Sequence, residues 1–280
     1  FALMFGHIWE PDKGRFDPWT PWPGVRGYPG QPEMFDALEV ADIFWLLKTR
    51  QIAATTAVAL LQVKIGMTES KALMLVFNKD EKAAKAMLAE KVKPHLEALH
   101  LIRGPDGGSL PWPKYEIGKE EIWFDGDNVI QAMASTASGA ISRVPRHQHW
   151  DEVREYEGNT AKEMWASNLP VLNKGAQLAL TSTNKPGTWY SEMSQKAVTD
   201  WREIIGKPHV EGMSAKGVPL DRGGPAVRLR VMPNVTFMFM PYDVRPERRV
   251  EGWYDYMMAT YQDDAKFKRD LAAAELGGDR

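Results

Sequence analysis

Two separate stretches of the sequence carry side chains suited to phosphate and metal chemistry. Residues 48–56, Lys-Thr-Arg-Gln-Ile-Ala-Ala-Thr-Thr, combine a lysine with several hydroxyls, and Asp151 and Glu152 are adjacent carboxylates. Hydrolysis of ATP needs backbone N–H groups at a helix start to hold phosphates. It also needs a hydroxyl and a carboxylate for Mg²⁺, and a second carboxylate to orient water. The two stretches together predict a site for ATP and Mg²⁺.

Taken alone, neither stretch is specific. The usual phosphate-binding pattern is G-x-x-x-x-G-K-[ST], but residues 48–56 lack both glycines and the lysine at its usual place. An ordinary strand-to-helix turn fits this segment about as well. An adjacent Asp-Glu is also common at a solvated helix start, where negative charge is favoured. The hydroxyl run Thr181-Ser182-Thr183, at the end of an apolar segment, adds polar groups suited to a γ-phosphate.

The segments around these residues have the pattern of β-α-β units. Residues 43–47 and 72–77 are unbroken apolar runs, which are typical of strands buried on both faces of a parallel sheet. Residues 57–63 predict a helix, and Asn78 with Glu81 resembles a capping box that opens a helix through about residue 92. This alternation predicts an α/β fold with a mainly parallel central sheet flanked by helices.

The rest of the chain adds further elements. Asp125-Gly126, between residues 121–124 and 129–133, predicts a hairpin. The other predicted elements are strands at residues 177–183 and 235–240, a loop at 206–225 and helices at 189–205, 251–261 and 264–275. The first 35 residues contain six prolines, which predict an irregular arm. The predicted divisions are an arm (1–35), a core (36–250) and a helical C-terminal segment (251–280).

Composition limits the classes of function. The chain has 280 residues, 44% of them apolar, and a formal net charge of −2. A near-neutral balance argues against a constitutive nucleic-acid coat protein, which is usually basic. The absence of cysteine excludes disulfides and zinc–sulfur sites. No apolar run reaches the roughly 18 residues of a membrane span, so we expect a soluble protein without a membrane partner. Because Phe1 is no initiator methionine, we expect a fragment or processed form of a longer protein.

Four pieces, in their order along the chain, resemble the ATPase domain of the large terminase subunit, the DNA-packaging motor of tailed bacteriophages. They are Trp22-Pro23 through Gln31, Lys48-x-Arg50-Gln51-x-x-x-Thr55, Asp151-Glu152 and Thr181-Ser182-Thr183. The ending Asp264-x-x-Phe267-x-x-Asp270-Leu271 is similar to the family's linker helix, which leads toward a nuclease domain absent here. The resemblance covers nearly the whole chain, and Lys-x-Arg-Gln is its most specific element.

The resemblance implies a P-loop NTPase of the ASCE type that hydrolyses ATP with Mg²⁺ and moves double-stranded DNA into a procapsid. The implied partners are DNA, the portal protein, the small terminase subunit and further copies of this chain in a ring. The implied location is the cytoplasm of the host of a virus-encoded protein. Two alternatives stay open: a catalytically weak P-loop module with a structural or assembly role, and a helicase-like ATPase outside packaging.

The resemblance also implies a role for each matching residue. Gln31 would recognise adenine, and Lys48 would bind phosphate from the start of the loop. Thr55 and Asp151 would hold Mg²⁺, and Glu152 would be the catalytic carboxylate. The remaining implied ATP contacts are Thr49, Arg50, Gln51, Ile52, Ala53, Ala54 and Thr56. Thr181, Ser182 and Thr183 would couple phosphate loss to movement, and Arg143 or Arg146 would be an arginine finger donated to a neighbouring subunit.

Several features depart from a plain match. Ala53 occupies a place where the family usually has glycine, and a positive φ there would cost about 1 kcal/mol. Residues 146–150, Arg-His-Gln-His-Trp, are polar for a strand buried on both faces, which predicts either an edge position or polar neighbours. His147 and His149 share a strand face; a hydrogen-bonded pair is favoured over a metal site. Residues 245–249 are basic, and a solvated loop is favoured there over a DNA contact.

Overall fold

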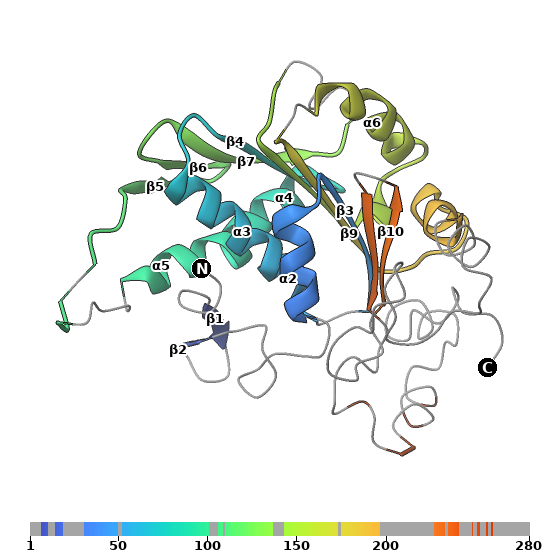
Figure 1. Cartoon of the computed structure of the whole chain (residues 1–280), viewed down its shortest axis with the longest axis horizontal. Helices are drawn as coiled ribbons and strands as arrows, with labels where there is room; N and C mark the ends of the chain where they lie inside the picture. Colours follow the sequence, from blue (N-terminus) through green and yellow to red (C-terminus); the bar gives the residue numbers. More distant parts are fainter. Residues whose placement is uncertain are drawn as a thin grey trace. The chain divides into compact units, whose positions relative to one another are not determined.

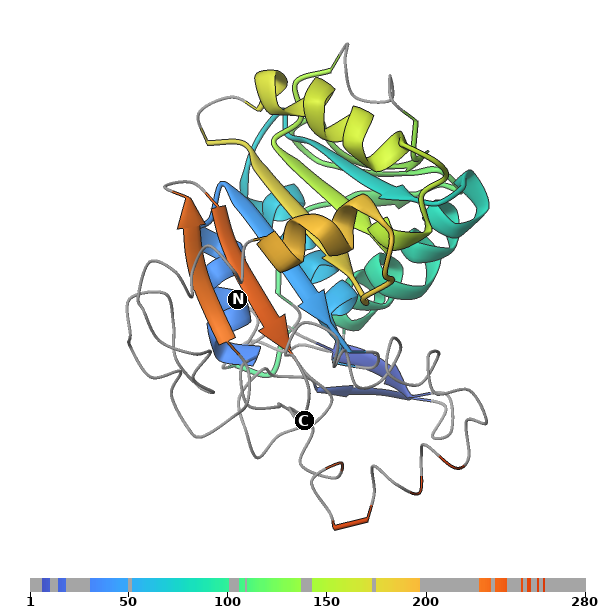
Figure 2. The same cartoon turned by 90° about the vertical axis from the view of Figure 1, so that its right-hand side faces the viewer.

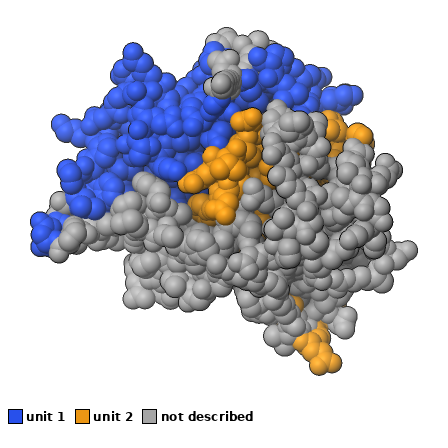
Figure 3. Space-filling view, viewed as in Figure 1, with its two compact units in different colours: residues 1–27, 55–151, 156–178 blue, residues 28–54, 152–155, 179–280 orange. Residues whose placement is uncertain are grey.

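A computed structural model gives the arrangement of most of the central part of the chain. The described residues are 7–10, 15–18, 31–49, 52–100, 106–108, 110–136, 143–172, 175–196, 227–232, 235–240, 248, 251–252, 256 and 259. The chain divides into two compact units, shown in Figure 3. Unit 1 comprises residues 1–27, 55–151 and 156–178, and unit 2 comprises residues 28–54, 152–155 and 179–280.

Unit 1 contains a sheet whose strand order is β9-β8-β4-β7-β6-β5. Its strands are β4 (Leu73–Asn78), β5 (Tyr115–Ile117), β6 (Glu121–Phe124), β7 (Asn128–Ala134), β8 (His147–Asp151) and the start of β9 (Gln177–Ser182). β4 pairs in parallel with both β7 and β8, and the hairpin β6–β7 and the strand β5 add antiparallel pairs. This confirms the predicted mainly parallel centre and the predicted hairpin, whose turn places Gly126 at φ 82°.

Helices cover both faces of the unit 1 sheet (Figures 1 and 2). On one face lie α3 (Ala54–Thr68), α4 (Glu81–Met87), a π-helical turn (Leu88–Val92) and α5 (Lys93–Leu99); on the other lies α6 (Thr160–Asn168). Short 3₁₀ turns occur at Val153–Glu155 and Leu169–Val171. In β4, Met74, Val76 and Phe77 are fully buried, as expected for a strand with helices on both faces.

The predicted capping box at Asn78 is wrong. Asp80 is the residue that caps α4, because its side chain accepts a hydrogen bond from the Ala83 backbone N–H at 2.7 Å. The Asn78 side chain instead accepts from the backbone N–H of Lys79 at 2.8 Å. Asn78 is the last residue of β4. A helix capped by Asn78 would begin at Lys79, but α4 begins at Glu81.

Unit 2 contains the strand order β10-β11-β3-β9, in which β9 contributes its later residues. The elements are α2 (Gln31–Val40), β3 (Ile43–Lys48), β10 (Val227–Met232) and β11 (Val235–Met240). β3 and β11 are parallel, with Lys48 opposite Met240, and β10 is antiparallel to β11. The strands predicted at residues 43–47 and 235–240 are confirmed.

The faces of β3 are covered by α2 and by helical residues 189–196 (Figures 1 and 2). Trp45 stacks on Tyr190 with ring centroids 4.7 Å apart, and its indole N–H donates to Ser194 Oγ at 2.9 Å. The Tyr190 hydroxyl donates to the Leu46 carbonyl at 2.6 Å. These contacts fix the strand that ends in Lys48, and the helix predicted from residue 189 is confirmed as far as residue 196.

The prediction of a wholly irregular N-terminal arm is also wrong. Strands β1 (His7–Glu10) and β2 (Arg15–Pro18) form an antiparallel pair, and α2 begins at Gln31. Pro32 is compatible with the helix because the N–H groups of a first turn have no intrahelical partner. The helices predicted after residue 250 lie outside the described residues, except for isolated positions, and the predicted divisions at residues 35 and 250 stay predictions.

Candidate nucleotide site

The polar strand β8 lies inside the sheet. All five of its residues are buried, β4 and β9 are its neighbours, and Gln177 N donates to the Arg146 carbonyl at 3.0 Å. The edge position considered from the sequence is therefore wrong. The alternative, polar neighbours, is confirmed: Gln62 Nε2 lies 3.2 Å from His147 Nδ1, and the Trp150 indole donates to Gln148 at 3.0 Å.

The environment of His147 keeps it neutral. Burial, together with smaller effects of the nearby His149 and Arg146, lowers the pKa of His147 to about 3. The His147 ring is hydrogen-bonded to Gln62. This agrees with the structural role that the sequence favoured for His147 and His149. In the part of the chain that the structure describes, no three His, Cys, Asp or Glu side chains gather to hold a metal ion.

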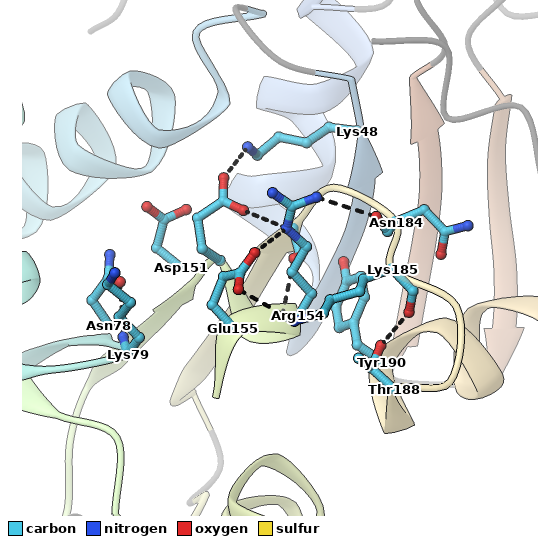
Figure 4. Close-up of polar contacts among 12 residues, drawn as sticks. Lys48, Asn78, Lys79, Asp151, Arg154, Glu155, Asn184, Lys185, Thr188 and Tyr190 are labelled. Atoms are coloured by element: carbon cyan, nitrogen blue, oxygen red, sulfur yellow. Dashed lines mark hydrogen bonds and ion pairs between the residues drawn. The ribbon is translucent and has the colours of Figure 1, made fainter. Parts of the chain in front are cut away.

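The carboxyl ends of β4 and β8 bring polar groups together within unit 1. Phe77 is in register with Trp150, so the last residues of the two strands, Asn78 and Asp151, lie side by side (Figure 4). Thr55, in the first turn of α3, donates its hydroxyl to Asp151 Oδ1 at 3.2 Å. Ligands bind at the carboxyl ends of strands in open α/β sheets. A hydroxyl and a carboxylate placed together there are the protein donors that hold Mg²⁺ in P-loop enzymes.

In unit 2, the last residue of β3 is bound to the residue that follows β8. Lys48 Nζ lies 3.0 Å from Glu152 Oε1, with the lysine side chain 8% exposed and the glutamate 30% exposed. Glu152 directly follows Asp151 in the sequence. Glu152 has φ 49°, a left-handed backbone that costs a non-glycine residue about 1–2 kcal/mol.

The loop between β3 and α3 also contains a left-handed residue. Ala53 has φ 57°, so the glycine-like backbone anticipated at this position is present and carries its steric cost. Gln31 is buried and donates its side-chain amide to the Ile52 carbonyl at 2.8 Å, which fastens the loop to α2. Thr49 N donates to the Met240 carbonyl at 2.9 Å. Arg50 and Gln51 lie outside the described residues.

The remaining loop residues start α3. Ala54 and Thr56 are buried, whereas Thr55 is partly exposed. A helix start of this kind presents backbone N–H groups and a positive dipole end to an anion.

The hydroxyl run at the end of β9 is fully buried. Ser182 Oγ accepts a hydrogen bond from the Arg154 backbone N–H at 3.1 Å. Thr183 Oγ1 and both side-chain amide atoms of Asn184 are buried and have no hydrogen-bond partner in the structure. Buried polar groups are normally paired, so unpaired atoms at a strand's carboxyl end fit a site that accepts a polar ligand. Within unit 1, the Thr55–Asp151 pair supplies the oxygen ligands that suit Mg²⁺.

The two candidate arginine fingers have partners away from Asp151. Arg146, just before the first residue of β8, makes a two-point ion pair with Glu69, with distances of 2.9 and 3.0 Å, and donates to Gln177 at 3.3 Å. Arg143 donates to Gln131 on β7. A finger acts on a neighbouring subunit, so the choice between Arg143 and Arg146 stays a prediction.

Two arginines near the site escaped the sequence interpretation. Arg248 is 5% exposed and donates to Thr49 Oγ1 at 3.3 Å, which contradicts a solvated position for this residue. The other residues of 245–249 lie outside the described residues, and the DNA-contact interpretation of the run stays a prediction. Arg154 is 4% exposed and forms ion pairs with both Glu152 and Glu155. No local signal marks Arg248, which belongs to a basic run. Arg154 lies two residues after Glu152, and this closeness is the only feature of the sequence that suggests a place at the site.

Comparison with solved structures gives the class of fold. The sequence matches no protein-family model and no curated protein. The fold is the predicted α/β fold with a mainly parallel central sheet flanked by helices. It is similar to the large terminase ATPase domain of Thermus phage P74-26, with a TM-score of 0.58 and 15% sequence identity over 89% of this chain and 99% of that one.

A second phage protein shows the same similarity. The large terminase of another thermophilic bacteriophage matches with a TM-score of 0.54 and 11% identity over 88% of this chain and 53% of that chain. The complex of that terminase with ADP matches with a TM-score of 0.55 and 11% identity over 87% and 52%. This chain therefore has the fold of large terminase ATPase domains. No helix among the described residues is long and apolar enough to cross a membrane.

Proposed function

We propose that this chain is the ATP-hydrolysing motor domain of a viral DNA-packaging terminase. The observation that carries the proposal is the contact between Lys48 and Glu152 at 3.0 Å, in a chain with the fold of large terminase ATPase domains. A lysine that binds phosphate and a carboxylate that orients water must lie near the same phosphoryl group. Their direct contact supports a shared task.

Each further residue has a proposed task at this site. Lys48 neutralises phosphate charge, Glu152 orients the attacking water and accepts its proton, and Thr55 with Asp151 holds Mg²⁺. When bound, Mg²⁺ would neutralise charge on the phosphate oxygens. Gln31 lies against the loop through its bond to Ile52 and is proposed to recognise adenine. Thr181, Ser182 and Thr183 are proposed to couple the site to movement.

The proposed setting follows from the fold of the phage terminases. We propose double-stranded DNA, the portal protein and the small terminase subunit as partners, and a ring of this chain on the portal. The proposed location is the cytoplasm of the viral host. The near-neutral net charge of −2 supports local and transient DNA contact over a permanent coat on DNA.

The test is Glu152→Gln. The side chain keeps its size but loses the charge that orients water, so we expect ATP turnover to fall by about 10³-fold, within the range for a lost general base. Binding of a non-hydrolysable ATP analogue with Mg²⁺, measured by calorimetry, should stay within a few-fold. Glu157→Gln is the matched control, because Glu157 is an exposed glutamate close to Glu152 in the sequence and has no part in the proposed site. Unchanged turnover in Glu152→Gln would disprove the catalytic assignment.

Two outcomes would select the alternative functions. If the unmodified chain shows no saturable binding of the analogue, it is a structural or assembly module with a P-loop fold. If it hydrolyses ATP and separates the strands of a DNA duplex, it is a helicase-like ATPase. Saturable binding, turnover stimulated by double-stranded DNA and no strand separation support the packaging motor.

A further inference from the structure

Arg154 is a buried cation beside the proposed catalytic carboxylate. Its guanidinium Nε lies 2.9 Å from Glu155 Oε1 and 3.5 Å from Glu152 Oε2, and the arginine side chain is 4% exposed. Removing a guanidinium from water is costly unless charged and hydrogen-bonding partners surround it. The two carboxylates provide this compensation, so the position of Arg154 and that of Glu152 depend on each other.

The same arginine is bound to the end of β9 at two points. Its Nη1 donates to the Asn184 carbonyl at 3.2 Å, and its backbone N–H donates to Ser182 Oγ at 3.1 Å (Figure 4). A guanidinium is planar and rigid, with its donors in fixed directions. A shift of the Asn184 carbonyl therefore rotates or displaces the group that also contacts Glu152.

The end of β9 has atoms available to sense a ligand. The Asn184 side chain is fully buried, and neither its amide nitrogen nor its amide oxygen has a hydrogen-bond partner. Leaving such atoms unpaired in the interior is unfavourable, and a ligand oxygen or a water molecule would pair with them. The carbonyl of this same residue is the acceptor for Arg154. Arg154 therefore contacts both Asn184, whose side chain would bind the ligand, and the Glu152 carboxylate.

We propose that Arg154 is a positioning residue that ties the Glu152 carboxylate to the end of β9. In this arrangement, Asn184 senses the ligand, and Arg154 makes the orientation of Glu152 depend on the placement of residues 182–184. The expected effect of Arg154 on the rate of ATP hydrolysis rests on the proposed function. The hydrogen bonds between Arg154 and the end of β9 do not, because they are present without nucleotide.

The first experiment compares Arg154→Gln, Arg154→Lys and the control Lys185→Gln. Lys185, like Arg154, forms an ion pair with Glu155, at 3.4 Å. Unlike Arg154, Lys185 makes no ion pair with Glu152 among the described residues. A misplaced catalytic group can lower the rate by about 100-fold. We expect kcat to fall by about this factor in Arg154→Gln, with KM for ATP within a few-fold. Arg154→Lys should recover part of the loss, and Lys185→Gln should stay near the unmodified rate.

A double-mutant cycle asks whether Arg154 acts through Glu152. If it does, adding Arg154→Gln to Glu152→Gln should reduce the residual rate by less than about 3-fold, because the group being positioned no longer functions. Equal fold losses in both backgrounds would overturn the proposal. An equal loss in Lys185→Gln would overturn it as well, since that would indicate a general effect of charge near Glu155.

Hydrogen exchange measured without nucleotide tests the mechanical link separately. The peptide covering residues 179–184 should exchange at least about 5-fold faster in Arg154→Gln than in Lys185→Gln, because a buried anchor of the strand end is lost. Thermal unfolding of each variant confirms that it remains folded, and Arg154→Lys provides the readout if the glutamine variant does not fold. Equal exchange in the arginine variants and the control overturns the link. If the unmodified chain neither binds nor hydrolyses ATP, the proposed function fails, and the exchange result still decides the link.

Discussion

The two ends of β8 are both rich in polar side chains, yet they differ in how those side chains are bound. At the start of the strand, Arg146 is held by Glu69 and Gln177, and His147 is held by Gln62. At the other end, Asp151 and Glu152 have a hydroxyl and two cations as neighbours. One end is a structural network, and the other has the composition of a reaction site.

Backbone geometry and exposure separate the two ends as well. Glu152 has a left-handed φ of 49° and a side chain that is 30% exposed, whereas His147 is fully buried. Residues held in costly conformations cluster at functional sites, where the surrounding structure maintains them. The carboxyl end of a strand is also where α/β sheets bind ligands. Polarity alone therefore does not distinguish the proposed site from the structural network; the strand end at which it lies and the backbone strain of Glu152 do.

After Glu152→Gln, the largest expected effect at the carboxyl end comes from Lys48→Met. Removing a preorganised cation from a phosphoryl-transfer site lowers the rate by about 100-fold or more. We expect this loss in steady-state ATP hydrolysis, together with weaker binding of an ATP analogue. Lys82→Met, an exposed residue of α4, is the matched control and should hydrolyse ATP normally. A normal rate in Lys48→Met would remove Lys48 from the site.

A second prediction concerns pH at the amino end. The pKa of His147 is about 3 in the folded chain and about 6.5 when unfolded, so the unfolded chain takes up the proton first as the pH falls. Stability conferred by the neutral ring is complete above about pH 6.5 and is lost toward pH 3. The slope is up to about 1.4 kcal/mol per pH unit. Urea unfolding at several pH values should show a smaller slope in His147→Gln; an identical slope would contradict the prediction.

A third prediction tests the strain in the loop between β3 and α3. Ala53→Gly removes the cost of a left-handed alanine, and we expect stability to rise by about 1 kcal/mol after the entropy cost of glycine is included. Ala59→Gly, in the interior of α3, should instead destabilise the chain by at least about 0.5–1 kcal/mol. Chemical denaturation of both variants measures the contrast. The same sign in both would show that φ at position 53 is not the cause.

The smallest expected effect is that of Glu69→Gln at the amino end. Its ion pair with Arg146 is partly exposed, with side-chain exposures of 31% and 36%, and such pairs contribute about 1 kcal/mol or less. We expect this loss in the free energy of unfolding, reduced further by added salt, and no change in the ATP hydrolysis of the isolated chain. A large loss of turnover would mean that the two ends of β8 are coupled.

Local pattern was sufficient for much of the fold. The apolar runs at residues 43–47, 72–77 and 235–240 are strands, and Asp125-Gly126 lies in a hairpin turn, as predicted. Such runs are readable because burial on both faces demands apolar side chains whatever the partner. The strand that ends in Asp151 did not follow from this logic, because residues 146–150 are polar. The cap at Asn78 failed because Asp80, two residues later, has the same kind of side chain and the better geometry.

The sequence by itself determined the α/β class and the residue types available for nucleotide chemistry, because hydrophobic runs and their order are local properties. Only the tertiary structure decided that the polar strand β8 is buried beside β4, that Lys48 meets Glu152, and that Arg154 and Arg248 are buried. These facts depend on which distant segments supply compensating partners for a buried charge. A partner such as Asn184, which is 30 positions away from Arg154 along the chain, leaves no trace in local spacing.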